Sequence, residues 1–454
     1  MENQQPQYQI GNLDLSEKWL DLVAHDKVSV TVEIPTSNSE SDNKNGNGPV
    51  TTTSVKYGVR RIESKTGFSC QEYVMEVGLK PSETSTNPRI RSINATLANI
   101  HNQQSGRTAN FKKAGSFVAQ LQVVRTLRPP PSDGFSEAST AVPPDYNAES
   151  DSFVTGPLRL ELRPLVGRLQ QVSSTSGKHD LLTPWDIFHN VSPADARGHF
   201  LLLPTLSNKD RNWRGQIFTT DDCHDVVHLA NAIDPPGSLF IGYNSVGAGA
   251  SQNHIHCHAW PCPPIPLIDS GVNPWNAYPV SNVTSICDFL DISAEDGQIE
   301  VSLLDYPVFC VLLSAPSTQL TLLSAALDVV MSCLGTSPHN LAFLNRMSHQ
   351  QGIDADESKV LGNGECNRFV DVYVFARSKE RSNVLPSLKL GVSEMMGVFH
   401  AQSDEELQKL ASLSGLQDEE TNQMEQALLD VTVDNEDTLW QSIKEQLEAL
   451  QGRI

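Results

Sequence analysis

The chain has 454 residues, a length that predicts two or three domains. Of these residues, 39% are apolar and 19% charged, which is typical of globular proteins. Its formal net charge of -21 argues against nucleic-acid binding, because phosphate backbones favour clusters of Lys and Arg. The eight cysteines form no C-x-x-C pair, and no segment approaches the roughly 20 apolar residues that span a bilayer. We therefore expect a cytoplasmic protein with no disulfide framework and no membrane partner.

Polar stretches of low complexity divide the chain, and we expect them on the surface because they offer too little apolar area to offset the entropy of ordering. They lie at residues 37–48, 81–88, 129–151, 173–178 and 350–365. Between them, branched and aromatic residues predict strands at 116–121, 158–165 and 199–203.

The next segment predicts a helix followed by two strands. Thr220 caps a helix whose apolar side chains recur at helical spacing over 226–233, and two prolines then end it. An apolar strand at 239–243, a loop of small residues and a histidine-rich strand ending at Trp260 follow. This order suits an antiparallel sheet with a helix across one face.

The second half of the chain shows a similar pattern. Strands are predicted at 308–313, 341–344 and 370–376, with a helix at 320–334. This half could repeat the architecture of the first, but it carries no H-x-H-x-H of its own. Any duplicate has therefore lost the chemistry.

The C-terminal segment is acidic and predicted to be helical. Residues 401–454 hold 13 Asp or Glu against 3 Lys or Arg, so they contribute -10 of the net charge of -21. Ser403 opens a capping box, and the apolar spacing over 439–447 predicts a further helix. Because no candidate nucleophile lies beyond residue 420, we expect deletion of 420–454 to spare the chemistry.

Three histidines alternate along the predicted strand and carry the clearest chemical signal. In an extended strand, His254, His256 and His258 project to one face at a spacing of roughly 7 Å, with Cys257 on the other face. Imidazoles in this arrangement could ligate a metal ion, attack phosphorus as nucleophiles, or be packed and hydrogen-bonded without chemistry.

The loop that precedes the histidines favours the second of these functions. Gly247 and Gly249 allow close approach of the backbone to a ligand, and successive small residues leave amides for an anion-binding nest. A phosphate benefits from such a loop, whereas a zinc site gains little from it. Cys257 and Cys262 also have the wrong spacing for a closed structural zinc site.

The motifs around the histidines resemble the histidine-triad (HIT) superfamily of nucleotidyl hydrolases and transferases. They are NVSP at 190–193, GH at 198–199, LLLP at 201–204 and HIHCH at 254–258. Further motifs resemble the GDP-hexose phosphorylases, which act on GDP-L-galactose or GDP-D-glucose. These are FVAQLQVVR at 117–125, GYNSVGA at 242–248, NHIH at 253–256 and EMMG at 394–397.

The resemblance implies an α+β fold with a HIT-like antiparallel sheet and helices, duplicated as two HIT-like halves in the manner of galactose-1-phosphate uridylyltransferase. The domain boundaries that we predict are 1–50 for an N-terminal segment with a disordered linker, 51–270 for a catalytic HIT-like domain with loop insertions, 271–402 for a second degenerate half, and 403–454 for an acidic helical tail.

The resemblance also implies a double displacement. His256 would attack the α-phosphorus of a GDP-hexose and become guanylylated, and inorganic phosphate would then take the guanylyl group to give GDP. His256 must present a neutral nitrogen, so its other nitrogen should donate to a backbone carbonyl near His254. His258 matches a position that donates to the phosphoryl oxygens. No cofactor and no metal follow from this mechanism.

Five further residues are predicted to bind substrate: Ser251, Asn244, Gly247, Asn190 and Arg125. Ser251 and Arg125 match positions of related proteins, and the other three lie in the motifs that carry the resemblance. Four of them also have a structural interpretation. The serine and the two asparagines could stabilise turns, and the arginine could be a solvated surface cation. His199 is interpreted as a structural residue that packs beneath the site.

Other functions stay open at this point. A dinucleoside polyphosphate phosphorylase or a HIT-type nucleotide hydrolase would use the same histidine. An alternative of another class is a metal-binding protein that uses His254, His256 and His258 as ligands. A third alternative is a catalytically silent scaffold with an acidic interaction tail. The sequence fixes neither the hexose nor the oligomeric state, and a homodimer is compatible with it.

Overall fold

The computed structural model describes most of the chain from residue 164 onward and isolated parts before it. The described ranges are 29–35, 52–62, 72–77, 111–114, 116–121, 145–147, 164–174, 177–190, 198–205, 214–234, 236–261, 283–294, 297–347, 368–401, 404–411 and 422–452, with single residues and short pieces between 15 and 27 and at 153, 160 and 280.

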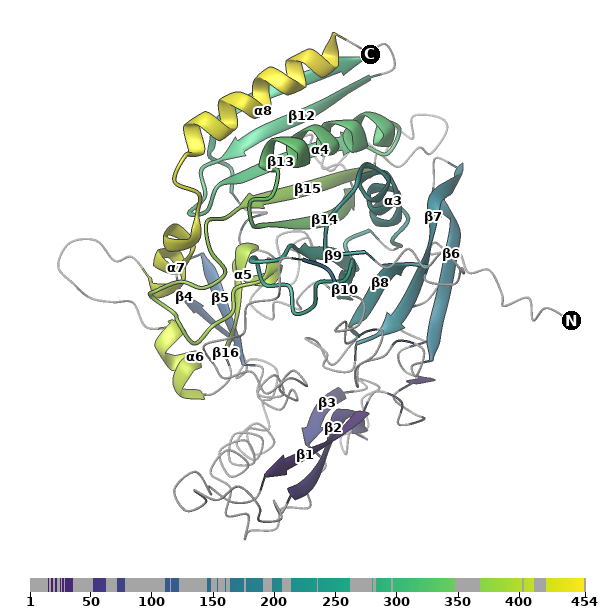
Figure 1. Ribbon diagram of the computed structural model, residues 1–454, viewed down its shortest axis with the longest axis vertical. Coiled ribbons are helices and arrows are strands. Elements are labelled where there is room, and N and C mark those ends of the chain that lie inside the picture. Colours follow the sequence, from purple (N-terminus) through teal and green to yellow (C-terminus); the bar gives the residue numbers. More distant parts are fainter. Residues whose placement is uncertain are drawn as a thin grey trace, which may run out of the picture.

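One antiparallel sheet of ten strands forms the centre of the molecule (Figure 1), with the order β11-β12-β13-β15-β14-β9-β10-β8-β7-β6. Its strands are β6 (Leu165–Ser174), β7 (Gly177–His189), β8 (Phe200–Pro204), β9 (Leu239–Asn244), β10 (Cys257–Pro261), β11 (Ile286–Ala294), β12 (Gly297–Leu304), β13 (Cys310–Pro316), β14 (His339–Met347) and β15 (Arg368–Ala376).

Two three-stranded sheets accompany the large one. The first joins β1 (Ser29–Pro35), β2 (Thr52–Ile62) and β3 (Glu72–Val77). The second joins β4 (Phe111–Ala114), β5 (Phe117–Leu121) and β16 (Val398–Ala401), and β16 pairs with β5 in parallel. The FVAQL motif forms β5, and the EMMG motif directly precedes β16. These motifs are far apart in the sequence, but they meet at the edge of this small sheet, where Val118 N donates to Gly397 O at 3.0 Å.

Helices cover both faces of the ten-stranded sheet, because its central strands are apolar on both sides. On one face, α3 (Thr220–Asn231), α4 (Leu320–Leu334) and α8 (Glu436–Gln451) pack in a shared apolar core. On the other face lie α5 (Val392–Met395), α6 (Asp404–Ala411), α7 (Gln423–Val431) and part of the second small sheet. The prediction of an antiparallel α+β fold is therefore confirmed.

Both halves of the large sheet have the same connectivity. From the outer strand inward, the first half runs β6-β7-β8-β10-β9 and the second runs β11-β12-β13-β15-β14. Helix α3 lies between β8 and β9 in the chain, and α4 lies between β13 and β14. The halves join where β14 pairs with β9 in antiparallel register. Their origin by duplication stays a prediction.

Helix α3 begins one residue earlier than predicted. Its N-cap is Thr219 rather than Thr220, and Thr219 and Asp222 form a reciprocal capping box. Both threonines are good capping residues, so the sequence alone does not separate them. The buried Asp225 then fixes the helix to β7 by accepting from Leu182 N at 2.7 Å, Thr183 N at 2.9 Å and Trp185 Nε1 at 3.0 Å.

Most predicted elements of the second half agree with the structure. The helix predicted at 320–334 is α4 with the same bounds, and the three predicted strands are β13, β14 and β15. In the first half, the strands predicted at 116–121 and 199–203 are β5 and β8. The strand predicted at 158–165 lies largely outside the described residues.

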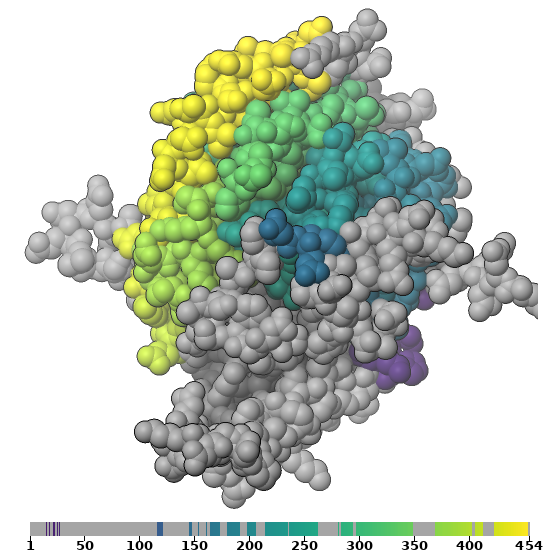
Figure 2. Space-filling view, viewed as in Figure 1, coloured from purple at the N-terminus to yellow at the C-terminus, as the bar shows by residue number. Residues whose placement is uncertain are grey.

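The C-terminal segment is helical, as predicted, but it is not a detachable tail. Met424, Ala427, Leu428 and Val431 of α7 are fully buried, and α8 contributes Trp440, Ile443 and Leu447 to the core. Figure 2 shows the C-terminal residues, in yellow, lying along the second half of the chain. Deleting 420–454 would expose both apolar cores, so this packing argues against the expectation that the deletion spares the chemistry.

Two boundaries in the predicted domain division separate segments that pair with each other. The boundary at residue 50 falls between β1 and β2, which pair from Ser29↔Gly58 to Pro35↔Thr52. The boundary at residue 270 separates β9 from its sheet neighbour β14. Among the helices that the structure describes, none is long and apolar enough to cross a membrane.

Candidate active site

His256 lies immediately before β10 and is almost fully buried, with 1% of its surface exposed. Its Nδ1 is 2.7 Å from the backbone oxygen of His254. Because a carbonyl oxygen can only accept, Nδ1 carries the proton and Nε2 keeps the lone pair of the neutral ring. The predicted donation to a carbonyl near His254 is therefore present in the structure.

The histidine segment is less regular than the predicted strand. Strand β10 begins at Cys257, so His254 and His256 precede it. The rings of His256 and His258 nevertheless approach each other, with 4.9 Å between their centroids. Cys257 points to the opposite face, as predicted, and burial raises the pKa of its thiol well above the ordinary range. The imidazole of His254 is fully buried, and its backbone carbonyl serves His256.

His258 is linked to His199, for which the sequence predicts a packing role. His199 Nε2 lies 3.0 Å from His258 Nδ1 and 3.2 Å from Asn190 Nδ2. An amide nitrogen can only donate, so with this amide orientation His199 Nε2 accepts and His258 Nδ1 donates. Asn190, predicted to bind substrate, thus lies in a chain of contacts that ends at the site.

The loop between β9 and β10 contains two glycines in the left-handed region, Gly247 with φ 77° and Gly249 with φ 100°. A Cβ on Gly249 would lie 2.6 Å from Leu390 O, so this loop needs glycine for close packing against the segment before α5. The amides of Ala248 and Ala250 both donate to Ser245 O, at 3.0 and 3.4 Å. The expectation that the loop leaves these amides for an anion is therefore wrong at these two positions.

Three predicted substrate-binding residues remain: Asn244, Ser251 and Arg125. Asn244 is buried, and its Oδ1 accepts from Asn340 Nδ2 and Val392 N, both at 2.7 Å. These contacts fix the loop and α5 to the sheet. The side-chain oxygen of Asn244 therefore has a structural role. Ser251 is exposed at the end of the loop. Arg125 lies outside the described residues. Substrate binding by these residues stays a prediction.

Two aromatic residues that the sequence did not single out cover the histidines. The Phe153 ring lies edge-on against His254 and His256, with centroid distances of 5.6 and 5.4 Å. Tyr146 lies edge-on against His254 at 6.1 Å. Tyr146 belongs to the stretch 129–151 that we expected on the surface; here it contacts the site. In the sequence, the signal for this contact was the presence of two aromatic residues, Tyr146 within the stretch 129–151 and Phe153 just after it.

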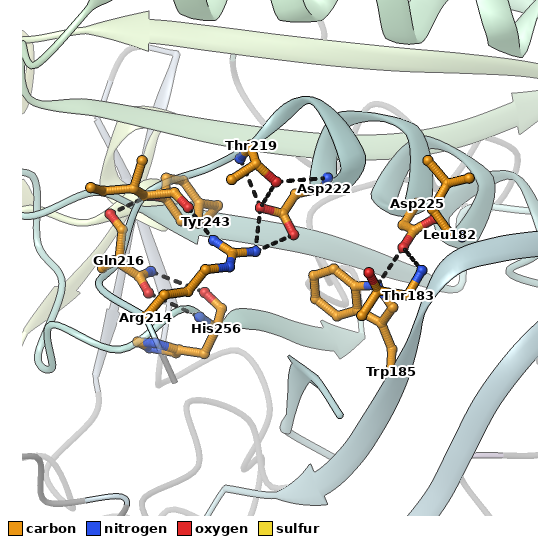
Figure 3. Close-up of polar contacts among 11 residues, drawn as sticks. Leu182, Thr183, Trp185, Arg214, Gln216, Thr219, Asp222, Asp225, Tyr243 and His256 are labelled. Atoms are coloured by element: carbon orange, nitrogen blue, oxygen red, sulfur yellow. Dashed lines mark hydrogen bonds and ion pairs between the residues drawn. The ribbon is translucent and has the colours of Figure 1, made fainter. Parts of the chain in front are cut away.

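The segment that precedes α3 also contacts the histidines (Figure 3). Arg214 O accepts from Ile255 N at 3.1 Å, and the Arg214 guanidinium contacts both carboxylate oxygens of Asp222 at 2.6 Å. Gln216 contacts the backbone of His256 on both sides. Among the described residues, no group of three His, Cys, Asp or Glu side chains is arranged to hold a metal ion.

Comparisons with known proteins give distant likenesses. No protein-family model matches the chain, and no curated protein matches it. Among solved structures, yeast Ap4A phosphorylase Apa2 in complex with AMP is similar with a TM-score of 0.39 and 13% identity, over 76% of this chain and 96% of that chain. The same enzyme without that ligand gives 0.38 and 12%, over 77% and 96%.

The complex of that yeast enzyme with Ap4A gives a TM-score of 0.38 and 12% identity, over 76% of this chain and 97% of that chain. Likenesses with TM-scores below 0.5 carry no weight for the function of this chain.

Proposed function

We propose that the chain is a nucleotidyltransferase that phosphorolyses a GDP-hexose through a guanylylated His256. The observation that supports this most is the 2.7 Å contact between His256 Nδ1 and His254 O. It holds the proton on one nitrogen, so that the other keeps its lone pair for attack. The substrate class rests on the motifs that resemble those of the GDP-hexose phosphorylases.

The reaction takes place in two displacements at one phosphorus. In the first, His256 Nε2 attacks the α-phosphorus and the bond to the bridging oxygen breaks, so hexose 1-phosphate leaves. In the second, an oxygen of inorganic phosphate attacks the same phosphorus and the P–N bond breaks, so GDP leaves and the imidazole is regenerated. No water is consumed and no redox partner is needed.

The neighbouring histidines fit the charge that develops in these steps. His258 lies beside the nucleophile, and its Nδ1 is held by His199 at 3.0 Å. In this orientation, His258 can donate from Nε2 to a phosphoryl oxygen when its ring is protonated. Donors placed at developing charge are typically worth about 100- to 1,000-fold in rate.

The test is covalent labelling with GDP-sugars. The parent protein should acquire one acid-labile guanylyl group, and a His256→Ala variant should acquire none while it keeps its fold. His224→Ala is the control for the loss of a histidine, because His224 lies on α3 and its ring packs against His228 rather than against His256. Equal labelling of the parent and the His256 variant would refute the proposal.

The substrate class is tested separately. Release of GDP from GDP-D-glucose and GDP-L-galactose should require inorganic phosphate, and diadenosine tetraphosphate should turn over much more slowly. Turnover without phosphate would show a hydrolase. A preference for the dinucleotide would assign the same histidine chemistry to a dinucleoside polyphosphate phosphorylase.

A further inference from the structure

Gln216 fills a break in the hydrogen bonding between β9 and β10. These strands pair in antiparallel register with His258 opposite Gly242, so the register continued by two residues would place His256 opposite Asn244. The pairing stops before that point. There, the Gln216 side chain donates from Nε2 to Asn244 O at 2.8 Å and to His256 O at 3.0 Å.

The same carboxamide also binds the other side of the His256 backbone. Gln216 Oε1 accepts from His256 N at 2.9 Å. One side chain therefore binds both the N–H and the C=O of the candidate nucleophile, as a residue of a neighbouring strand would do. Gln216 is 2% exposed, so water does not compete with these bonds.

Gln216 is itself held in place from both sides. Its N–H donates to Asn253 Oδ1 at 2.8 Å, and its carbonyl accepts from the Tyr243 hydroxyl at 2.7 Å. A Cβ on the preceding Gly215 would lie 2.9 Å from Asn253 Oδ1, so a larger residue there would displace the oxygen that binds Gln216 N. The carboxamide is thus preorganised by residues of β9 and of the loop before β10.

A second anchor connects the histidine segment to α3. Ile255 N donates to Arg214 O, and the Arg214 guanidinium is paired with the buried Asp222 of the capping box. Two consecutive backbone N–H groups, of Ile255 and His256, are therefore bound by the segment before α3. Figure 3 shows the second of these contacts, between Gln216 and His256. These contacts fix the backbone on which the imidazole stands.

We propose that Gln216 is a positioning residue for the nucleophile, which replaces the missing strand partner of His256 and directs its imidazole. This role rests on the proposed function of His256. Gln216 acts through the backbone of His256, so its loss should lower kcat and leave KM for the GDP-sugar unchanged. A misplacement of about 1 Å at a reacting group can cost on the order of 100-fold in rate.

The test compares two buried carboxamides with the same bonding pattern. Gln216→Met removes the three bonds at His256 and Asn244 with little change in shape. Asn345→Leu is the matched control, because Asn345 is fully buried, accepts from Gly237 N and donates to Asn231 O and Ile233 O, away from the histidines. Both variants should lose stability, but only the first should label His256 about 100-fold more slowly per folded molecule.

A readout without nucleotide separates this proposal from the proposed function. In ¹⁵N NMR of the histidine rings, the parent and Asn345→Leu should show His256 as the Nδ1–H tautomer, and Gln216→Met should show a mixture of tautomers. A parent protein that never labels on His256 would overturn the proposed function, while the NMR spectra would still decide the role of Gln216.

Gln216→Glu keeps the test decisive if the methionine variant does not fold. A neutral carboxyl accepts from His256 N and donates one bond, whereas a carboxylate faces two carbonyl oxygens and donates none. The labelling rate of this variant, divided by that of the parent, should be near one at acid pH and fall as the carboxyl ionises. A ratio independent of pH, or equal slowing by Asn345→Leu, would overturn the proposal.

Discussion

Phe153 lies edge-on against His256, with 5.4 Å between the ring centroids and an interplanar angle of 85°. Phe153 is 5% exposed and His256 is 1% exposed, so the aromatic ring separates the nucleophile from solvent. A substrate phosphorus can reach His256 Nε2 only where such covering groups leave a path or move aside. The accessibility of His256 is therefore set in part by Phe153.

We expect Phe153→Ala to make His256 more reactive toward diethylpyrocarbonate, measured by mass spectrometry of its peptide. The variant should also lose about 3 kcal/mol of unfolding free energy, as large-to-small changes of a buried Phe usually do. Phe188→Ala is the control, because Phe188 belongs to the same apolar cluster and is similarly buried. It should cost comparable stability without changing the reactivity of His256, and equal reactivity of both variants would contradict this account.

His199 should matter for rate through His258. Replacing His199 with Ala removes the partner at 3.0 Å from His258 Nδ1. A hydrogen bond worth about 1 kcal/mol corresponds to a rate loss of roughly fivefold to tenfold. Gln carries a side-chain amide of similar reach, so His199→Gln should recover part of the lost rate. Stopped-flow experiments measure the rate of His256 labelling in both variants. An unchanged rate in His199→Ala would show that His199 only packs beneath the site.

The site shows clearly where local sequence patterns stop being informative. Helix α4 was predicted with its bounds because its apolar spacing is a local property of 15 residues. Gln216 and His256, in contrast, are 40 residues apart and meet by side-chain hydrogen bonds that no local pattern encodes. The β9–β10 pairing ends at His258, next to that contact.

Asn244, which was predicted to bind substrate, also makes contacts that its local sequence does not reveal. Its position at the end of β9 was evident from the sequence, but the partners of its Oδ1 lie 96 and 148 residues further along the chain. The donation from His256 to His254 could be anticipated because both residues belong to one short segment. Contacts within one short segment of the site were therefore predictable from the sequence, whereas contacts between segments far apart in the chain were not.

The stability of the protein should fall on the acid side because of His228. This histidine packs between His224 and His179, with ring centroids 4.4 and 4.8 Å away. Burial, and then repulsion from these two rings, lowers the pKa of His228 from 6.5 to about 4. The unfolded chain therefore takes up a proton below about pH 6.5 that the folded chain refuses until about pH 4, so stability decreases over this interval.

His228→Leu should remove most of this dependence. At pH 4.5 the parent should have lost about 2 to 3 kcal/mol relative to pH 7.5 through this group, as follows from the two pKa values. Urea unfolding at both pH values measures the difference. The exposed His25 provides the control, since His25→Ala should leave the acid loss intact. An equal acid loss in His228→Leu and the parent would assign the effect to other groups.

Two neighbouring leucines of α7 test whether the C-terminal segment belongs to the core. Leu428 is fully buried in the cluster that contains Phe399 and Met424, whereas Leu429 is 51% exposed. Leu428→Ala should therefore cost about 2 to 5 kcal/mol through lost burial and the cavity left behind. Leu429→Ala should stay within about 0.5 kcal/mol of the parent, as exposed substitutions usually do. Chemical denaturation measures both, and a detachable acidic tail would instead give two variants as stable as the parent.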